Sequence, residues 1–249
     1  MVATARTLLF YLLLGLWTIF ISSSVILFGL FVPRKRRHQL FVQPYGRGVM
    51  LLCRVICGVG YRIVGREHIP QGSAVIAANH QSTWETFFLQ TLLTPQAQVV
   101  KKELMSIPFF GWAFRLLCAI PIDRGNPKKA LMKIIQAGSD YLTEGFWVLV
   151  FPEGTRRPAG SPGRFTQGAA AMATRSGKPI LPIAHNAGRC WPGRGWVKVP
   201  GTIDVVIGPL IETEGKNSKQ ITNEAQHWIH TTLAEIDPQV PAAESTESL

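Results

Sequence analysis

The stretch SAVIAANHQSTWETF, residues 73–87, joins an apolar run to a polar loop and then to a helix-like segment. Its first part, Ser73–Ala78, is short, mostly apolar and followed by Asn, which is typical of a buried strand. Residues 82–85, Ser-Thr-Trp-Glu, fit the capping box S-x-x-E that begins many helices. The stretch therefore predicts a strand, a loop and a helix in succession.

Similar units recur along the chain. Short runs rich in Val and Ile, bounded by Gly, Pro or Asn, predict strands at 61–66, 73–78, 97–101, 118–122, 146–151, 179–184 and 203–208. Helical patterns lie between several of them, at 83–93, 127–143, 165–176 and 216–236. This alternation predicts an α/β fold with a mostly parallel central sheet flanked by helices.

Ligands of such sheets bind beyond the carboxyl ends of the strands. His80 lies in one of these loops, five positions before Glu85. On one continuous helix their side chains would point about 140° apart, but they can meet if His80 precedes the helix and Glu85 lies in its first turn. Two alternatives follow. Either Glu85 orients His80 as a catalytic base, or Glu85 only caps the helix and His80 is a structural residue.

A second loop, FPEGTRRPAG at residues 151–160, ends another apolar strand. Pro152 cannot donate a backbone hydrogen bond and therefore stops the strand. Gly154 permits a turn whose backbone amides face an anion, and the guanidinium of Arg156 matches phosphate oxygens. The alternative is a surface turn with solvated arginines.

More cations follow two other strands. Lys101 and Lys102 lie at one strand end, and Asp123 and Arg124 follow another. Each alone is typical of a solvated surface. Together they place several positive charges on the side of the sheet where His80 is expected, which favours a phosphorylated substrate.

The amino-terminal end predicts membrane association. Residues 7–32 contain no charged residue and no histidine, and as one helix they would reach roughly 39 Å, more than the ~30 Å hydrocarbon core. The basic run PRKRRH at 33–38 follows, so the positive-inside rule places the remaining chain in the cytoplasm. A secretory signal is the rival, but no clear A-x-A cleavage site is present. The serines at 22–24 would permit a bend, so a spanning helix and a segment dipping into one leaflet both remain open.

A second apolar stretch, residues 49–64, carries Arg54 and Arg62 and predicts an interfacial helix that runs into a strand. The tail is short, polar and acidic, which is typical of disorder. We therefore expect three parts: a membrane-anchoring helical segment at 1–60, a catalytic domain at 61–237 and a disordered tail at 238–249.

The composition narrows the class of partner. The chain has 249 residues and a net charge of +11, which favours anionic membranes or phosphorylated substrates. No zinc-finger spacing or RNA-binding string is visible, so we expect no nucleic acid. No metal site is expected, because His227 and His230 lack a nearby acidic or Cys partner. No Cys-x-x-Cys occurs, and we expect four reduced thiols, at Cys53, Cys57, Cys118 and Cys190.

Five blocks resemble a known family when they are taken together. They are NHQSTWET at 79–86, KKELMSIPFFGW at 101–112, PIDR at 121–124, FPEGTR at 151–156 and KPILPIA at 178–184. In this order and spacing they resemble the glycerolipid acyltransferases, most closely the 1-acyl-sn-glycerol-3-phosphate acyltransferases. The resemblance covers roughly residues 60–210, and the hydrophobic amino-terminal segment is also typical of the family.

The resemblance implies roles for several residues. The family's His-x4-Asp motif falls on His80 and Glu85, where Glu stands in place of the usual Asp and is one methylene longer. Pro182 matches the last block and is expected to shape a strand end. The substrate-binding positions implied by the other motifs are Lys102, Arg124, Glu153, Gly154, Thr155 and Arg156.

The activity that the resemblance implies is transfer of a fatty acyl group to the sn-2 hydroxyl of lysophosphatidic acid. The donor would be acyl-CoA or an acylated acyl carrier protein, and no cofactor is expected. His80 would be the general base, worth about 10²–10⁴-fold in rate, and no Ser or Cys is placed to form an acyl-enzyme. Residues 107–118 would form the wall of an acyl channel or a membrane-dipping loop, unless they are ordinary core.

We expect the protein at the cytoplasmic face of a bacterial-type inner membrane, in contact with anionic lipids. Two rival functions remain. The acceptor could be another lysolipid, such as a lyso-ornithine lipid. Alternatively, the chain could be a membrane-anchored lipid-binding protein without catalytic activity.

Overall fold

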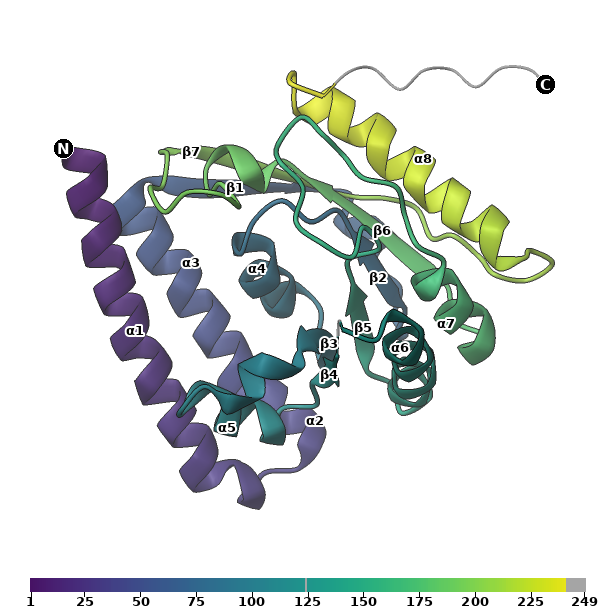
Figure 1. Ribbon diagram of the computed structural model, residues 1–249, viewed down its shortest axis with the longest axis horizontal. Helices are drawn as coiled ribbons and strands as arrows, with labels where there is room; N and C mark the ends of the chain where they lie inside the picture. Colours follow the sequence, from purple (N-terminus) through teal and green to yellow (C-terminus); the bar gives the residue numbers. More distant parts are fainter. Residues whose placement is uncertain (124, 241–249) are drawn as a thin grey trace.

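The structure, a computed structural model, describes residues 1–123 and 125–240 (Figure 1). Arg124 and most of the predicted tail at 238–249 therefore lie outside the described residues. Within them, a seven-stranded sheet forms the centre, with the strand order β1-β7-β6-β2-β5-β3-β4. The strands are β1 (Val59–Val64), β2 (Val75–Ala78), β3 (Gln96–Lys101), β4 (Ile120–Ile122), β5 (Trp147–Val150), β6 (Ile180–His185) and β7 (Gly201–Ile207).

The predicted fold class is confirmed. Every neighbouring pair of strands is parallel except β6 and β7, which run antiparallel. The central strands β2, β5 and β6 are buried along their whole length, as expected for parallel strands that are covered on both faces. Their carboxyl ends open toward the same edge of the sheet, which is where the candidate loops begin.

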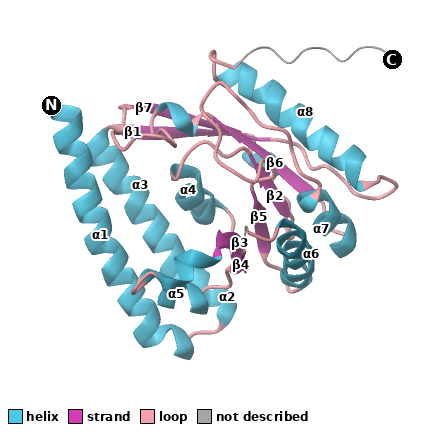
Figure 2. Ribbon diagram, viewed as in Figure 1, coloured by secondary structure: helices cyan, strands magenta, loops and turns pink. Residues whose placement is uncertain are grey.

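Helices cover both faces of the sheet (Figure 2). The helices are α1 (Val2–Phe28), α2 (Arg34–Arg37), α3 (Gln43–Cys57), α4 (Trp84–Leu92), α5 (Phe110–Leu116), α6 (Pro127–Thr143), α7 (Gly168–Ser176) and α8 (Ser218–Ile236). Alternate residues of β2 face opposite ways: Ile76 packs with α3 and α4, whereas Val75 and Ala77 pack with α6, α7 and α8.

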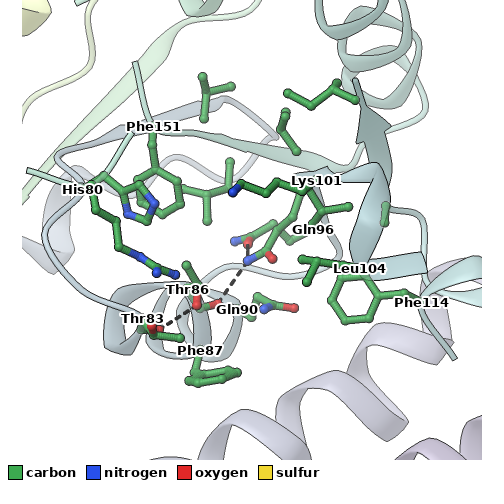
Figure 3. Close-up of a pocket in the computed structure, with 18 of the residues that line it drawn as sticks. His80, Thr83, Thr86, Phe87, Gln90, Gln96, Lys101, Leu104, Phe114 and Phe151 are labelled. Carbon is green, nitrogen blue, oxygen red and sulfur yellow. Dashed lines mark hydrogen bonds between the residues drawn. The ribbon is translucent and has the colours of Figure 1, made fainter. Parts of the chain in front are cut away.

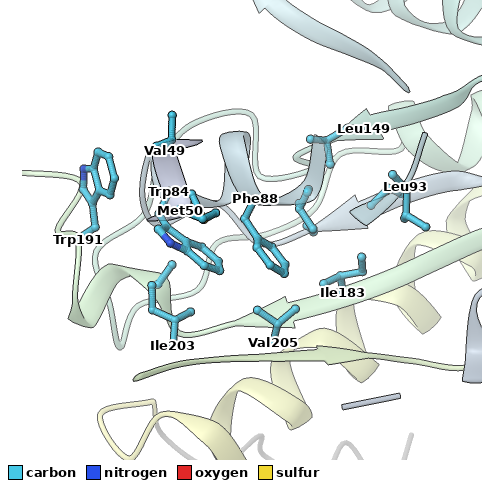
Figure 4. Close-up of a cluster of buried hydrophobic side chains, with 14 of the residues drawn as sticks. Val49, Met50, Trp84, Phe88, Leu93, Leu149, Ile183, Trp191, Ile203 and Val205 are labelled. Atoms are coloured by element: carbon cyan, nitrogen blue, oxygen red, sulfur yellow. The ribbon is translucent and has the colours of Figure 1, made fainter. Parts of the chain in front are cut away.

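Helix α4 is held by a large apolar cluster on its face of the sheet (Figure 4). Trp84 and Phe88 are stacked with their ring centroids 4.5 Å apart, and both are almost completely buried. They lie over Ile183 and Val205 of the neighbouring strands. Since α4 begins directly after the loop that contains His80, this packing fixes where that loop ends.

The amino-terminal helices form a hairpin along one flank of the molecule (Figure 1). Helix α1 is continuous through the serines at 22–24, so the bend that these residues permitted is absent. Trp17 Nε1 donates to the backbone oxygen of Tyr45, 3.1 Å away. The two helices approach closely because position 48 is glycine, where a Cβ atom would lie 2.4 Å from Trp17 Nε1.

Helix α1 is attached to the rest of the protein at both ends. Near its start, Thr7 accepts a hydrogen bond from the backbone N–H of Lys198, and Phe10 packs edge-on against Trp191. Near its end, Val25 is buried in a cluster with Ala113 of α5. The helix therefore lies along the α/β domain instead of projecting from it.

Two helical stretches, Val2–Phe31 and Arg34–Cys57, are long and apolar enough to cross a membrane. The outward side of α1 exposes large apolar side chains, including Leu8, Leu12, Leu16, Ile19, Phe20 and Leu27. A surface of this kind is typical of contact with lipid or with another protein.

Candidate active site

His80 and Glu85 are in contact, which the alternative in which Glu85 orients His80 requires. His80 lies in the loop after β2, and Glu85 lies in the first turn of α4. Nδ1 of His80 is 2.8 Å from Oε1 of Glu85. The same oxygen accepts the backbone N–H groups of Gln81 and Ser82, at 3.1 and 2.8 Å. Glu85 therefore caps the helix and orients the imidazole with a single atom.

This geometry fixes the roles of the two ring nitrogens of His80. Burial alone would raise the pKa of the Glu85 carboxyl, but the neighbouring His185 and His80 rings and the backbone N–H of Ser82 lower the pKa below its usual value. An ionised Glu85 accepts the proton of Nδ1, which leaves Nε2 as the basic nitrogen. The ring of Phe151 stacks on the imidazole at 4.1 Å and limits its rotation (Figure 3).

A buried pair behind the loop holds His80 in place. The Asn79 side chain donates to the backbone oxygen of His185 and accepts its backbone N–H, at 2.9 and 3.0 Å. Nε2 of His185 donates to the Asn79 backbone oxygen at 2.8 Å, and its Nδ1 accepts the N–H of Ala187. Burial also lowers the pKa of His185. Sequence analysis missed both residues.

The loop after β5 packs directly against the His80 loop. The backbone N–H of Arg157 donates to the His80 oxygen at 2.7 Å, and Nε of Arg156 donates to the Ser82 oxygen at 3.1 Å. Gly154 has φ 71, a conformation that favours glycine. Glu153 is buried beside the backbone N–H of His80, and burial raises the pKa of its carboxyl to about 8.

Not all the predicted cations reach this site. Arg156 and Lys101 line the pocket that contains His80. The neutral residue Thr155, which was also predicted to bind substrate, lines it as well. Lys102 is exposed, is absent from the lining and forms an ion pair with Asp123. Arg124 lies outside the described residues. The structure therefore places Lys101, not its neighbour Lys102, in the lining of this pocket.

The pocket is large enough to hold an alkyl chain. It has a volume of about 1090 Å³ and extends from His80 to the amino-terminal hairpin. Phe110, Phe114 and Leu117 form part of its wall, which agrees with the expectation for residues 107–118. The opposite side of the same segment is exposed, at Ile107, Phe109 and Trp112.

Four polar side chains inside this pocket were not anticipated from the sequence. Gln90, Gln96 and Gln98 line the pocket, and Figure 3 shows Gln90 and Gln96 between His80 and the apolar side chains Leu104 and Phe114. His38 lines the pocket on the short π-helical turn His38–Val42, and neither of its ring nitrogens has a hydrogen-bond partner among the described residues.

No metal site is evident in the part of the chain that the structure describes. No group of three or more His, Cys, Asp or Glu side chains converges there. The four cysteines are free, and three of them are buried. The polar groups of the pocket are therefore a histidine–carboxylate pair, several cations and neutral amides.

Known proteins resemble this chain over most of its length. Residues 60–186 match the model of the family described as Acyltransferase. A relative named 1-acyl-sn-glycerol-3-phosphate acyltransferase from Pseudomonas aeruginosa is 45% identical over 95% of this chain and 93% of its own length. A relative of the same name from Escherichia coli is 28% identical over 92% of this chain and 95% of its own.

A solved structure shows the same fold. The crystal structure of the 1-acyl-sn-glycerophosphate (LPA) acyltransferase PlsC from Thermotoga maritima matches with a TM-score of 0.78 and 23% sequence identity. The match covers 99% of this chain and 98% of that one, so it includes the amino-terminal hairpin.

Proposed function

Because this chain belongs to the acyltransferase family, we propose that it transfers a fatty acyl group from a thioester to the sn-2 hydroxyl of 1-acyl-glycerol-3-phosphate, giving phosphatidic acid. The names of the relatives support the acceptor. The observation that carries the proposal is the 2.8 Å contact between Nδ1 of His80 and Glu85, inside a pocket that is apolar at one end and cationic at the other.

His80 is the general base of the proposed reaction. Its Nε2 takes the proton of the acceptor hydroxyl as the oxygen attacks the thioester carbonyl. The new C–O bond forms, the C–S bond breaks, and the imidazolium returns the proton to the leaving thiolate. Glu85 stabilises the imidazolium, and base catalysis of this kind is typically worth about 10²–10⁴-fold. The route needs no acyl-enzyme.

The substrate phosphate is held by cations at the mouth of the pocket. Arg156 is fixed by its bond to the Ser82 oxygen, and Lys101 faces the same space. A guanidinium binds phosphate oxygens through charge-assisted hydrogen bonds. Such binding sets the hydroxyl beside His80 and makes the attack effectively intramolecular. Arg124, which the resemblance assigns to this role, remains part of the proposal.

The lysolipid reaches the pocket from the membrane. Ile21 and Val25 of α1 line the same cavity as His80, and the outer side of this helix is apolar. The basic run Arg34–Arg37 follows the helix and suits anionic head groups. We place the protein on the cytoplasmic face of the bacterial inner membrane, with α1 in contact with the bilayer.

The test is an assay of the purified protein with lysophosphatidic acid and both donor types, acyl-CoA and acyl carrier protein thioesters. We expect phosphatidic acid from wild type and a loss of about 10²-fold or more with His80→Ala. A lyso-ornithine lipid, offered in parallel, tests the rival acceptor. Lipid binding without turnover in the wild type would identify a non-catalytic binding protein and reject the proposal.

A further inference from the structure

The pocket contains an ordered group of amide side chains where an alkyl chain would need only apolar contacts. Gln96 and Gln98 alternate with Ala97 along β3, so their side chains project from the same face of the strand, toward α4. Both are at least nine-tenths buried, and both line the pocket. Figure 3 shows Gln96 between His80 and the apolar side chains Leu104 and Phe114.

Hydrogen bonds fix the orientation of each amide. Nε2 of Gln96 donates to the backbone oxygens of Leu89 and Leu93, at 3.1 and 3.3 Å, so its Oε1 must be an acceptor. Nε2 of Gln98 then donates to that Oε1 at 3.3 Å and to the backbone oxygen of Thr86 at 3.0 Å. A reversed Gln98 would place its own oxygen against two acceptors. The orientation is therefore determined by the backbone of α4.

This arrangement leaves one oxygen without a partner. Both N–H groups of Gln98 are used, and its Oε1 makes no hydrogen bond to any described residue. The carbonyl of Thr86 also accepts Nε2 of Gln90 at 2.7 Å, which braces the group from the helix side. The lining of the pocket thus includes an amide of fixed orientation whose oxygen has no partner among the described residues.

A ligand that extends from His80 into this pocket meets a lining that includes Gln98. An unsubstituted alkyl chain would displace water and leave the acceptor of Gln98 unsatisfied, which is unfavourable. A chain that bears a hydroxyl would donate a hydrogen bond to it. A site built to hydrogen-bond a substrate hydroxyl discriminates strongly against an analogue that lacks it.

We infer that Oε1 of Gln98 is a subsite for a hydroxyl group on a lipid acyl chain, so that the enzyme favours hydroxylated chains over plain chains of equal length. The inference rests on the proposed function and specifies the substrate class of the same pocket. The hydroxylated chain has two sources, the acyl donor and the 1-acyl group of the lysolipid. The interaction with Gln98 is the same for both.

The test compares kcat/KM for hexadecanoyl thioesters that are plain or hydroxylated at successive single carbons. Each donor is supplied as the coenzyme A and as the acyl carrier protein thioester, with 1-hexadecanoyl-glycerol-3-phosphate as acceptor. A second arm pairs the plain donor with acceptors whose 1-acyl chain carries the hydroxyl. We expect a preference of about tenfold for at least one hydroxylated chain, and the arm in which it occurs identifies which chain lies in the pocket.

Two variants locate the preference. Gln98→Met keeps the length of the side chain and removes the acceptor, so the ratio of hydroxylated to plain substrate should fall to about one. Gln136→Met makes the same change on an exposed part of α6 and should keep the wild-type ratio.

Three results are distinguishable. Equal wild-type rates on plain and hydroxylated chains in both arms would overturn the inference, whether or not the Gln98 variant folds. An unchanged ratio in folded Gln98→Met would overturn it as well. An absence of transfer from every donor would reject the proposed function itself.

Discussion

One carboxylate oxygen, Oε1 of Glu85, accepts three hydrogen bonds, from Nδ1 of His80 and from two backbone N–H groups. Two of these bonds need only an oxygen acceptor. In the proposed reaction, the third must also stabilise the positive charge that forms when the imidazole takes a proton. The structural and the catalytic demands on this atom can therefore be separated by changing its charge while keeping its shape.

Glu85→Gln makes this change. The amide oxygen can still accept the backbone N–H groups, so we expect a melting temperature close to that of wild type. Without the charge, kcat should fall by about 10²–10⁴-fold. Steady-state rates and thermal unfolding measure the two effects, with exposed Glu144→Gln as control. A variant with wild-type kcat would show that Glu85 only caps the helix.

We expect His185 to act on the proposed reaction through Asn79, without touching the substrate. Its ring and backbone hold Asn79, the residue directly before His80. We expect His185→Ala to displace the base and lower kcat by about ten- to a hundredfold, with KM for the lysolipid nearly unchanged. His227→Ala, an exposed change on α8, should leave kcat unchanged. An effect on KM alone would contradict a positioning role.

The buried carboxyl of Glu153 gives a pH dependence of stability with a definite sign. Burial raises its pKa to about 8 in the folded protein, so the folded state holds a proton that the unfolded chain releases near its ordinary pKa of 4.5. The free energy of unfolding should therefore be highest below about pH 4.5 and should fall as the pH rises to about 8. Glu153→Gln should flatten this decline, as measured by melting temperatures from pH 5 to 8. An equal decline in wild type and in Glu153→Gln would mean that another group causes the pH dependence.

At the scale of residues, the sequence predicted His80, Glu85 and Arg156, because each of them lies in a short motif that can be recognised locally. It predicted Lys102 where the structure places Lys101 in the pocket, since neighbouring residues at a strand end point in opposite directions and no local pattern distinguishes them. His185 could not be found, because its partner Asn79 is 106 positions away in the chain.

At the scale of elements, all seven predicted strands are present, and the helix predicted at 127–143 matches α6. Asn126 caps this helix and Pro127 occupies its first position, both of which are visible in the sequence. Strand limits differ by at most two residues, because they depend on hydrogen bonds to strands elsewhere in the chain. The antiparallel pairing of β6 and β7 has no local signal and was not predicted.

The π-helical turn at His38 is an element with an energetic cost. The imidazole is 5% exposed, and its nitrogens have no partner among the described residues. Leaving a buried polar group unpaired costs about 1–3 kcal/mol. We therefore expect His38→Leu to raise the melting temperature, measured against Arg36→Leu, an exposed change on the preceding turn. A lower melting temperature would mean that the imidazole is satisfied in solution.

At the scale of the whole molecule, α1 combines an apolar outer side with firm attachment at both ends. The bilayer therefore meets a helix that is already packed on the α/β domain. The double change Leu12→Glu and Leu16→Glu adds charge to this outer side without altering the packed side. We expect about tenfold or greater loss of binding to phospholipid vesicles in a flotation assay.

The matched control is Met132→Glu, which places the same charge on an exposed apolar position of α6. Vesicle binding should be unchanged in this variant. Equal binding of all three proteins would mean that α1 does not face the lipid and would favour a protein partner on that surface.

Ile21 and Val25 of α1 form part of the pocket wall. The amino-terminal hairpin is therefore both the segment expected to contact the membrane and a part of the pocket. Deleting the hairpin to obtain a water-soluble enzyme should remove part of the pocket wall. We expect this deletion to abolish turnover as well as membrane binding. By the same reasoning, replacing residues 1–60 with those of a relative should transfer part of that relative's acyl-chain preference. An exchange of the hairpin should therefore alter acyl-chain selectivity as well as membrane binding.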